Sequence, residues 1–265
     1  MAHKFYIIPL IALVLFVSCG RENLKRQAEE EKAIQKSIEM YHSPDWLIRL
    51  NGIEAVKNPP HPKGWSQNAE KSIVTFLIGA TEDAHPAIRI EAVKSLAPYN
   101  SNKNVIGRLK EICMNDGNNV RWTALDVLSQ SSAPETLDVF IANVSSIDIL
   151  IREASIKGIM RVSNDSLKQD VLPYILAAIQ DQAIGVRIAA LENLKFKDDA
   201  IYQALAKCFQ EDGLTVSLLA SLLKAINGYK IDSATWEKIV PLLTHADTGI
   251  RLLALRALKN GQSDL

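Results

Sequence analysis

The sequence has few cysteines, little glycine and proline, and no excess charge of either sign, and each shortage excludes a class of protein. Three cysteines in 265 residues do not make a disulfide framework. Thirty basic residues balance thirty acidic ones, so no net field attracts polyanions. Twelve glycines and ten prolines are too few for a fibrous or disordered chain. We therefore expect a folded, helical protein with a sizeable core.

A long hydrophobic run is also missing. The most apolar stretch is residues 5–17, which are thirteen in number. A membrane-spanning helix needs about 20 apolar residues, whereas thirteen suit the hydrophobic region of a secretion signal. The next residues complete the segment Phe16-Val17-Ser18-Cys19, which resembles a bacterial lipobox, although Phe16 stands where that family usually has leucine.

The lipobox resemblance implies a lipoprotein precursor. Residues 1–18 would be a signal peptide removed by signal peptidase II, Cys19 would carry the covalent lipid, palmitate among its acyl chains, and residues 19–23 would be a short tether. Two or more acyl chains anchor a protein stably. The implied location is the bacterial cell envelope, and Gly20 favours the outer membrane, facing the periplasm or the surface, over the inner membrane. An uncleaved anchor helix, or a signal peptide with a coincidental cysteine, is the alternative.

An internal repeat dominates the remaining chain. A β-branched residue, which we call the anchor, is followed by arginine six times, and Val216-Ser217 fills the one gap. The anchors are spaced by 40, 32, 31, 35, 30 and 34 residues, the scale of a helix-pair solenoid. They are Ile48, Ile88, Val120, Ile151, Val186, Val216 and Ile250.

Each anchor begins an apolar stripe. A small residue stands four positions after every anchor, such as Gly52 and Ala92, and apolar residues stand five and eight positions after every anchor but the sixth. This spacing predicts one buried face of a helix, and the small residue allows a neighbouring helix to approach closely. The sixth repeat departs from the pattern at Ser217, Ser221 and Lys224.

Segments 171–194 and 238–258 are similar to HEAT repeats, because each combines a proline in its first helix, a turn aspartate, a β-branched residue with arginine, and the small and apolar positions. The resemblance implies an all-α fold, an α-solenoid wound as a right-handed superhelix of about seven HEAT-like helix pairs. We assign residues 24–260 to the solenoid and 261–265 to a C-terminal tail.

The family resemblance also implies that turn aspartates and arginines form a structural ladder between repeats, best represented by Asp181 and Arg187. Aspartates three to five residues before the anchors are predicted to cap the second helices. The predicted ladder residues are Asp83, Arg89, Asp116, Arg121, Arg152, Asp181, Arg187, Asp247 and Arg251.

Candidate partner-binding residues are the exposed ones of the second helices, on the expected concave face. Six positions after the anchors the side chains alternate in sign, which argues against tracking a nucleic acid backbone. Trp122 replaces aliphatic residues and is either a binding anchor or a packing residue. The candidates are Trp122, Glu54, Lys94, Asp126, Lys157, Glu192 and Arg256, and the sixth repeat has Leu222 at this position.

The last helix is rich in leucine and ends the chain almost at once. A terminal repeat normally needs a polar outer face. Either most of these leucines point inward, or Leu252 and Leu253 dock a partner or a second copy of the chain.

We find no catalytic motif, no phosphate loop and no metal-ligand spacing around the five histidines. The sequence therefore predicts a non-enzymatic, membrane-anchored scaffold that binds a protein, with no nucleic acid and no cofactor other than the lipid on Cys19. The alternative is an enzyme or enzyme subunit of the HEAT-like lyase type. A third option is a membrane-structural role through self-association.

Overall fold

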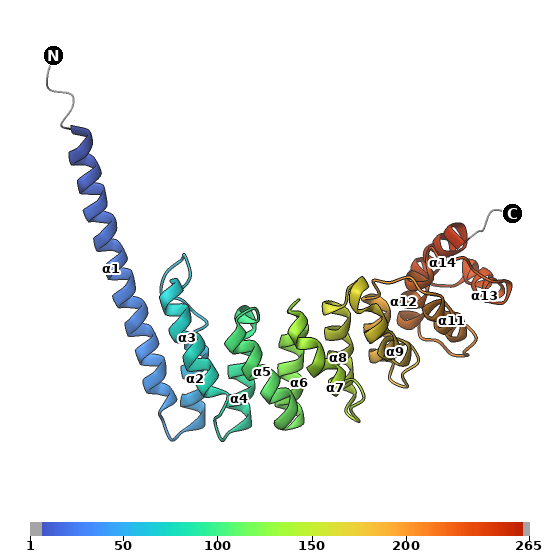
Figure 1. Cartoon of the computed structure of the whole chain (residues 1–265), viewed down its shortest axis with the longest axis horizontal. Coiled ribbons are helices and arrows are strands. Elements are labelled where there is room, and N and C mark those ends of the chain that lie inside the picture. Colours follow the sequence, from blue (N-terminus) through green and yellow to red (C-terminus); the bar gives the residue numbers. More distant parts are fainter. Residues whose placement is uncertain (1–6, 262–265) are drawn as a thin grey trace, which may run out of the picture. The chain divides into compact units, whose positions relative to one another are not determined.

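The computed structural model describes residues 7–261, and side chains from residue 21 onward. The described residues form fourteen α-helices and four 3-10 turns and contain no strand (Figure 1). The fourteen helices follow one another as the seven predicted pairs, so the prediction of an all-α solenoid is confirmed. The chain divides into two compact units, residues 1–108 and 109–265.

The first unit contains four helices, a 3-10 turn and the beginning of a fifth helix. In this unit α1 packs against α2 and α3, and α4 packs against α2 and α3. Its elements are α1 (Ile7–Tyr41), α2 (Trp46–Ala55), α3 (Gln67–Ala80), α4 (Pro86–Ser95), η1 (Ala97–Tyr99) and the part of α5 (Lys103–Asn115) up to Arg108.

The second unit holds the rest of α5 and nine further helices. The elements up to the fifth pair are α6 (Asn118–Ser129), η2 (Pro134–Thr136), α7 (Leu137–Asn143), α8 (Ile149–Val162), η3 (Asp165–Leu167), α9 (Lys168–Ile179) and α10 (Ile184–Glu192). The last two pairs are α11 (Asp199–Cys208) with α12 (Val216–Ile226), and α13 (Ser233–Ile239) and η4 (Val240–Thr244) with α14 (Thr248–Gly261).

Within the second unit the second helices lie in one row, since α6 packs on α8, α8 on α10, α10 on α12 and α12 on α14. The first helices α9 and α11 also pack on each other. Each pair therefore buries its apolar stripe against the next pair, which is how a solenoid builds its core.

The N-cap residue of the second helices lies three positions before the anchor. Asp83, Asp116 and Asp181 are therefore not the predicted caps, because the N-caps of α4, α6 and α10 are residues without a side-chain cap bond, namely His85, Gly117 and Ala183. Asp45 and Asp148 accept hydrogen bonds from the amides of Leu47 and Leu150, so the predicted caps form there. In the sixth repeat Thr215, not Asp212, is the N-cap, and its hydroxyl accepts from the amide of Leu218.

This cap corrects the register of the sixth repeat. Val216 is 49% exposed, whereas Leu218 is only 2% exposed, and Leu222, Leu223 and Ile226 are fully buried. Burial at Leu218 and at four, five and eight positions after it reproduces the stripe of the second, third and fourth repeats. The anchor is therefore Leu218, two residues later than predicted, and the intervals around it become 32 and 32 residues.

The predicted signal peptide and lipidated cysteine lie outside the residues whose side chains the structure describes. The backbone of α1 is one helix from Ile7, and it includes the predicted tether, residues 19–23. Among the described residues, no helix combines the length and the hydropathy that crossing a bilayer requires.

Candidate functional site

The arginines that follow the anchors link neighbouring repeats. Nη1 of Arg49 donates to the carbonyl oxygens of Ser43 and Pro44 in its own turn, at 3.2 and 3.1 Å. Its Nε and Nη2 donate to the carboxylate of Asp83 in the next repeat, at 2.9 and 3.1 Å. One guanidinium therefore fixes both its own turn and the distance to the following repeat.

The predicted pairing of Asp181 with Arg187 is wrong, because the ladder is offset by one repeat. The carboxylate of Asp181 accepts from Arg152 of the preceding repeat. Arg187 instead reaches forward to Glu211, to which its Nη1 and Nη2 donate at 2.7 and 3.0 Å. Arg152 and Arg187 therefore each pair with an acid of the next repeat.

Arg121 uses an amide in place of an acid. Its Nε and Nη2 donate to Oδ1 of Asn143, at 3.2 and 2.5 Å. Asn143 is nearly fully buried and its amide donates in turn to the carbonyl of Val139. The link between these two repeats is therefore polar and forward-reaching, although no carboxylate takes part in these bonds.

The remaining ladder residues make local bonds. Nη1 of Arg89 and Nη1 of Arg251 donate to two carbonyls each in the turns that precede their helices. Asp116 and Asp247 accept backbone amides at the start of the following helices. Through these contacts the two arginines fix the turns that precede their own helices.

The ladder also sets the ionisation of its acids. Burial alone would raise the pKa of Asp83, but hydrogen bonds from Arg49 and from the amide of His85, together with the charge of Arg49, hold that pKa below its ordinary value. The carboxylate is therefore ionised wherever the protein is folded near neutral pH.

The side chains six positions after the anchors form a different set, which we call the +6 row. With Leu218 as the sixth anchor, Lys224 joins this row and Leu222 leaves it, because Leu222 is buried. The row comprises Glu54 and Lys94 in the first unit, and Asp126, Lys157, Glu192, Lys224 and Arg256 in the second.

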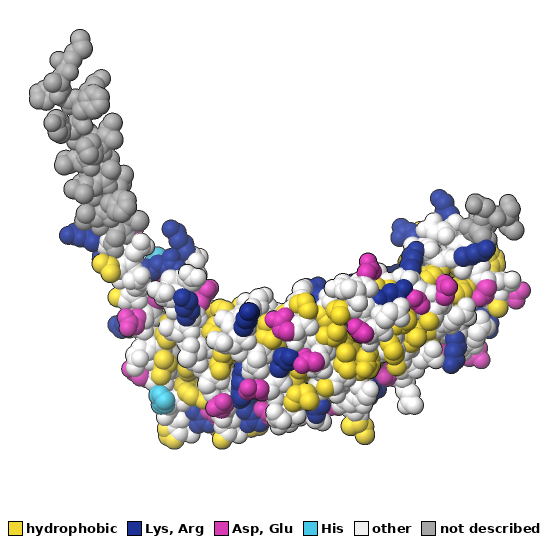
Figure 2. All heavy atoms as spheres, viewed as in Figure 1, with side chains coloured by type: hydrophobic (Ala, Val, Ile, Leu, Met, Phe, Trp, Pro, Cys, Tyr) yellow, Lys and Arg dark blue, Asp and Glu magenta, His cyan; other side chains and the backbone are white. Residues whose placement is uncertain are grey.

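The +6 row remains available to solvent. Asp126 and Lys157 are half-buried and the other members are exposed. Lys157 pairs with Glu153 on its own helix, at 2.6 Å, and no described ion pair joins two members of the row. Within the second unit the row crosses consecutive, contacting helices with the signs minus, plus, minus, plus, plus. Figure 2 likewise shows acidic and basic side chains interspersed over the repeats.

Trp122 and the terminal leucines divide into half-buried and exposed side chains. Trp122 and Leu253 are half-buried. Leu252 is 47% exposed, so this leucine is not one of those that point into the core. The indole N–H of Trp122 has no hydrogen-bond partner among the described residues, and it stays a candidate contact residue.

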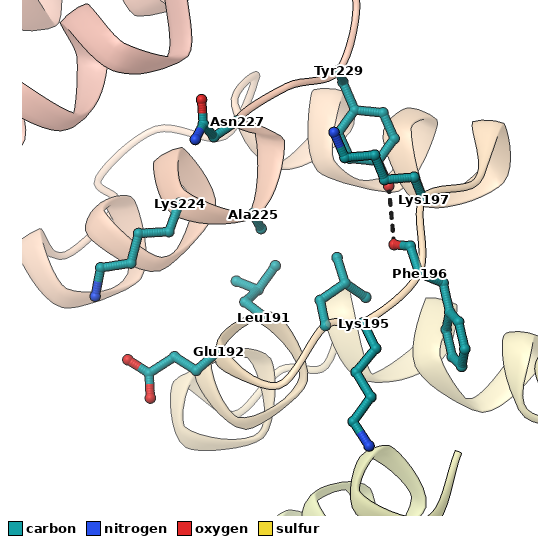
Figure 3. A pocket seen from close by; sticks show the side chains of 10 residues that line it. Leu191, Glu192, Lys195, Phe196, Lys197, Lys224, Ala225, Asn227 and Tyr229 are labelled. Carbon is teal, nitrogen blue, oxygen red and sulfur yellow. Dashed lines mark hydrogen bonds between the residues drawn. The ribbon is translucent and has the colours of Figure 1, made fainter. Parts of the chain in front are cut away.

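A pocket of about 540 Å³ lies between the loops that follow α10 and α12 (Figure 3). Its lining includes Leu191 and Ala225 at the base, and four charged side chains around them. They are Glu192, Lys195, Lys197 and Lys224.

The charged side chains around this pocket point in different directions, apart from Glu192 and Lys224 (Figure 3). Figure 3 shows the ends of Glu192 and Lys224 on one side, away from Lys197, which lies beside Tyr229. Nζ of Lys197 donates to the carbonyl of Gly228 at 2.7 Å, and Nζ of Lys195 donates to that of Arg161 at 2.8 Å. Two of the three lysines thus donate to backbone carbonyls of neighbouring segments.

The two cysteines of the described residues are poor nucleophiles. Both are fully buried and free. Burial raises the pKa of Cys113 to about 12 and also raises that of Cys208. The thiolate is the reactive form, so these side chains do not supply the nucleophile of a lyase-type enzyme. The described residues also contain no cluster of three or more histidine, cysteine or acidic side chains that could hold a metal ion.

Comparison with protein families identifies part of the chain. Residues 73–160 match the family described as HEAT repeats, so the predicted resemblance is confirmed for this segment. No curated protein sequence matches the chain.

Three solved structures resemble the chain to different degrees. YibA of Escherichia coli is similar with a TM-score of 0.65 and 16% identity, over 88% of this chain and 82% of that chain. A designed armadillo repeat protein matches with a TM-score of 0.47 and 12% identity, over 87% and 100% of the two chains. Human deoxyhypusine hydroxylase, in a complex with glycerol, matches with a TM-score of 0.44 and 13% identity, over 90% and 99%. At these identities the likeness to YibA concerns the fold alone.

Proposed function

We propose that this protein is a membrane-anchored scaffold of the bacterial cell envelope, which binds a partner protein through the exposed face of its second helices. The observation that supports it is that the charged side chains of these helices fall into two groups with different contacts. The arginines one position after the anchors bond inside the stack, whereas the charges of the +6 row do not pair with one another.

The alternation of sign along the row favours a protein partner over a polyanion. Second helices of neighbouring pairs lie about 8–10 Å apart, so the row offers one charge per helix along the stack. A nucleic acid would meet a like charge at Asp126 and Glu192. A folded protein or a peptide with alternating charges would meet opposite ones, which gives specificity and register.

The anchoring half of the proposal rests on the lipobox resemblance around Cys19. A Cys19→Ala variant should move from the membrane fraction to the soluble fraction of lysed cells, because the acyl chains are lost. Mass spectrometry of the wild-type N-terminus should find a lipid-modified residue 19 at the start of the mature chain. An unmodified N-terminus, with membrane association unchanged in the variant, would refute the anchor.

The binding half is tested by photo-crosslinking in cells, with a photoreactive amino acid at position 224 or 126. Both positions should give the same discrete crosslinked product. The matched control is position 237 in α13, since Glu237 is exposed on a first helix.

Reversing two charges of the +6 row then tests whether the partner recognises these charges or merely lies near them. Glu192→Lys together with Lys224→Glu should abolish the crosslink at position 126, while Glu237→Lys should leave it unchanged. Equal crosslinking from both helix faces, or no effect of the reversal on the row, would contradict the proposed binding face.

A further inference from the structure

The outer face of the last repeat exposes side chains that every other repeat buries. The residue five positions after the anchor is at most 3% exposed in the first six repeats and 54% exposed at Leu255. The six buried residues are Ile53, Val93, Leu125, Ile156, Leu191 and Leu223. Leu255 therefore occupies a position that the solenoid elsewhere covers with another layer.

Further apolar side chains surround Leu255 on the last pair. Leu252 is 47% exposed, and Val240 and Leu243 of η4 are 40% and 37% exposed. Helix α14 packs against η4, so the four side chains belong to one end of the stack. We call this surface the terminal face.

Arg251 at the edge of the terminal face has an unused donor. Its Nη1 donates to His245 and Ala246 carbonyls, as Arg152 does in its own turn. Its Nη2 donates to the hydroxyl of Thr248 at 2.8 Å. Among the described residues no carboxylate contacts Arg251, and its Nε has no partner.

The charge of α14 decides between possible occupants. Residues 248–261 contain Arg251, Arg256 and Lys259 and no acidic residue. Figure 2 shows basic side chains gathered at the C-terminal end of the second unit. Two copies that met through their terminal faces would bring like charges together, which disfavours a symmetric dimer. An acidic occupant would gain from both the cations and the apolar surface.

We propose that the terminal face docks an acidic amphipathic helix of a partner protein. Its apolar side would cover Leu252 and Leu255, and one carboxylate would accept from Arg251, as Asp181 accepts from Arg152 within the stack. Its three contact residues, Arg251, Leu252 and Leu255, do not belong to the +6 row, although Arg256 of that row lies on the same helix. The site does not depend on the anchor at Cys19.

The test uses the full-length chain in mild detergent and a fluorescent 18-residue peptide. The peptide has leucine at helical positions i, i+3, i+4 and i+7 and glutamate at most others. We expect binding by fluorescence anisotropy, weakened by at least about tenfold in Leu252→Asp/Leu255→Asp and in Arg251→Gln. Because Leu252 and Leu255 are exposed, circular dichroism should show that the double variant remains folded. The Glu237→Lys variant should bind as the wild type does.

Two control peptides separate this docking from simple charge attraction. A scrambled peptide of the same composition lacks the apolar side, and a lysine-for-glutamate peptide has the opposite charge, so neither should bind. The proposal is overturned if the scrambled peptide binds as tightly as the designed one, if the Leu252→Asp/Leu255→Asp variant binds the peptide as tightly as the wild type does, or if no binding is seen. A doubled mass of the free chain that Leu252→Asp/Leu255→Asp reduces to the monomer would also overturn it, because the occupant would then be a second copy.

Discussion

Arg152 and Asp181 stand 29 residues apart in the chain, yet Nε and Nη2 of the arginine donate to the two carboxylate oxygens of the aspartate, both at 2.9 Å. Nη1 of the same arginine donates to the carbonyls of Ser146 and Ile147. Both charged side chains are mostly buried, at 17% and 15% exposure. A bidentate pair in this setting holds two repeats at a fixed spacing.

Removing the acid from this pair should destabilise the protein. Asp181→Asn leaves the Arg152 guanidinium without its counter-charge, and we expect a loss of about 1–3 kcal/mol in the free energy of unfolding. Urea unfolding followed by circular dichroism measures it. Arg152→Met and the double variant complete a mutant cycle, and a coupling energy near zero would contradict the role of the pair.

Acid should unfold the protein through the same carboxylates. Burial alone would raise the pKa of Asp181, but hydrogen bonds from Arg152 and the Ala183 amide, with the Arg152 charge, lower it below its ordinary value. A carboxyl whose pKa is lower in the folded state contributes stability above its unfolded pKa, about 4, and loses it as the pH falls through the folded value.

The measurement is the urea midpoint between pH 7 and pH 3. We expect a plateau at neutral pH and a decline that begins below about pH 5. In Asp181→Asn the decline should be shallower, because one of the titrating groups is gone. A urea midpoint that rises toward pH 3 would show that these carboxyl groups do not have lowered pKa values in the folded protein.

Close approach of α1 and α2 depends on the absence of a side chain at Gly52. A Cβ atom there would lie 2.6 Å from the backbone oxygen of Ser37, which cannot move without shifting α1. We expect Gly52→Ala to cost about 1–3 kcal/mol. The control is Gly107→Ala in α5, where a Cβ would meet nothing within 4 Å. That substitution should stabilise the helix by about 0.5–1 kcal/mol, so equal effects of the two would refute the packing argument.

The seven helix pairs could be predicted because each anchor stripe recurs, and recurrence averages out the noise of a single copy. The partner of each arginine could not be predicted in the same way. Asp181 precedes Arg187 by six residues and Asp148 precedes Arg152 by four, so sequence proximity suggests pairs within one repeat. Which acid an arginine reaches depends on how far one repeat is shifted against the next, and that shift is a property of the packed stack.

The prediction of the register of the sixth repeat was wrong for a different reason. Residues 216–226 contain apolar side chains at more positions than one stripe can use, so the periodicity fits two registers. The pattern favours Val216 over Leu218 because Val216, like the six other anchors, is β-branched. The signal that could have decided is the regular spacing of 32 residues on both sides of Leu218, together with Thr215 as a capping residue three positions before it.

The two registers make opposite predictions for two single substitutions. Leu218→Ala should cost about 2–5 kcal/mol, because it leaves a cavity at a buried anchor. Val216→Thr should change the free energy of unfolding by less than about 0.5 kcal/mol, because Val216 is 49% exposed at the first turn of α12. Urea unfolding of the two variants decides the register. If Val216 were the anchor, the threonine hydroxyl would be buried without a matching partner, and the two substitutions would cost similar free energies of unfolding. Lys224 would then no longer belong to the +6 row, and the proposed binding face would lose one of its charges.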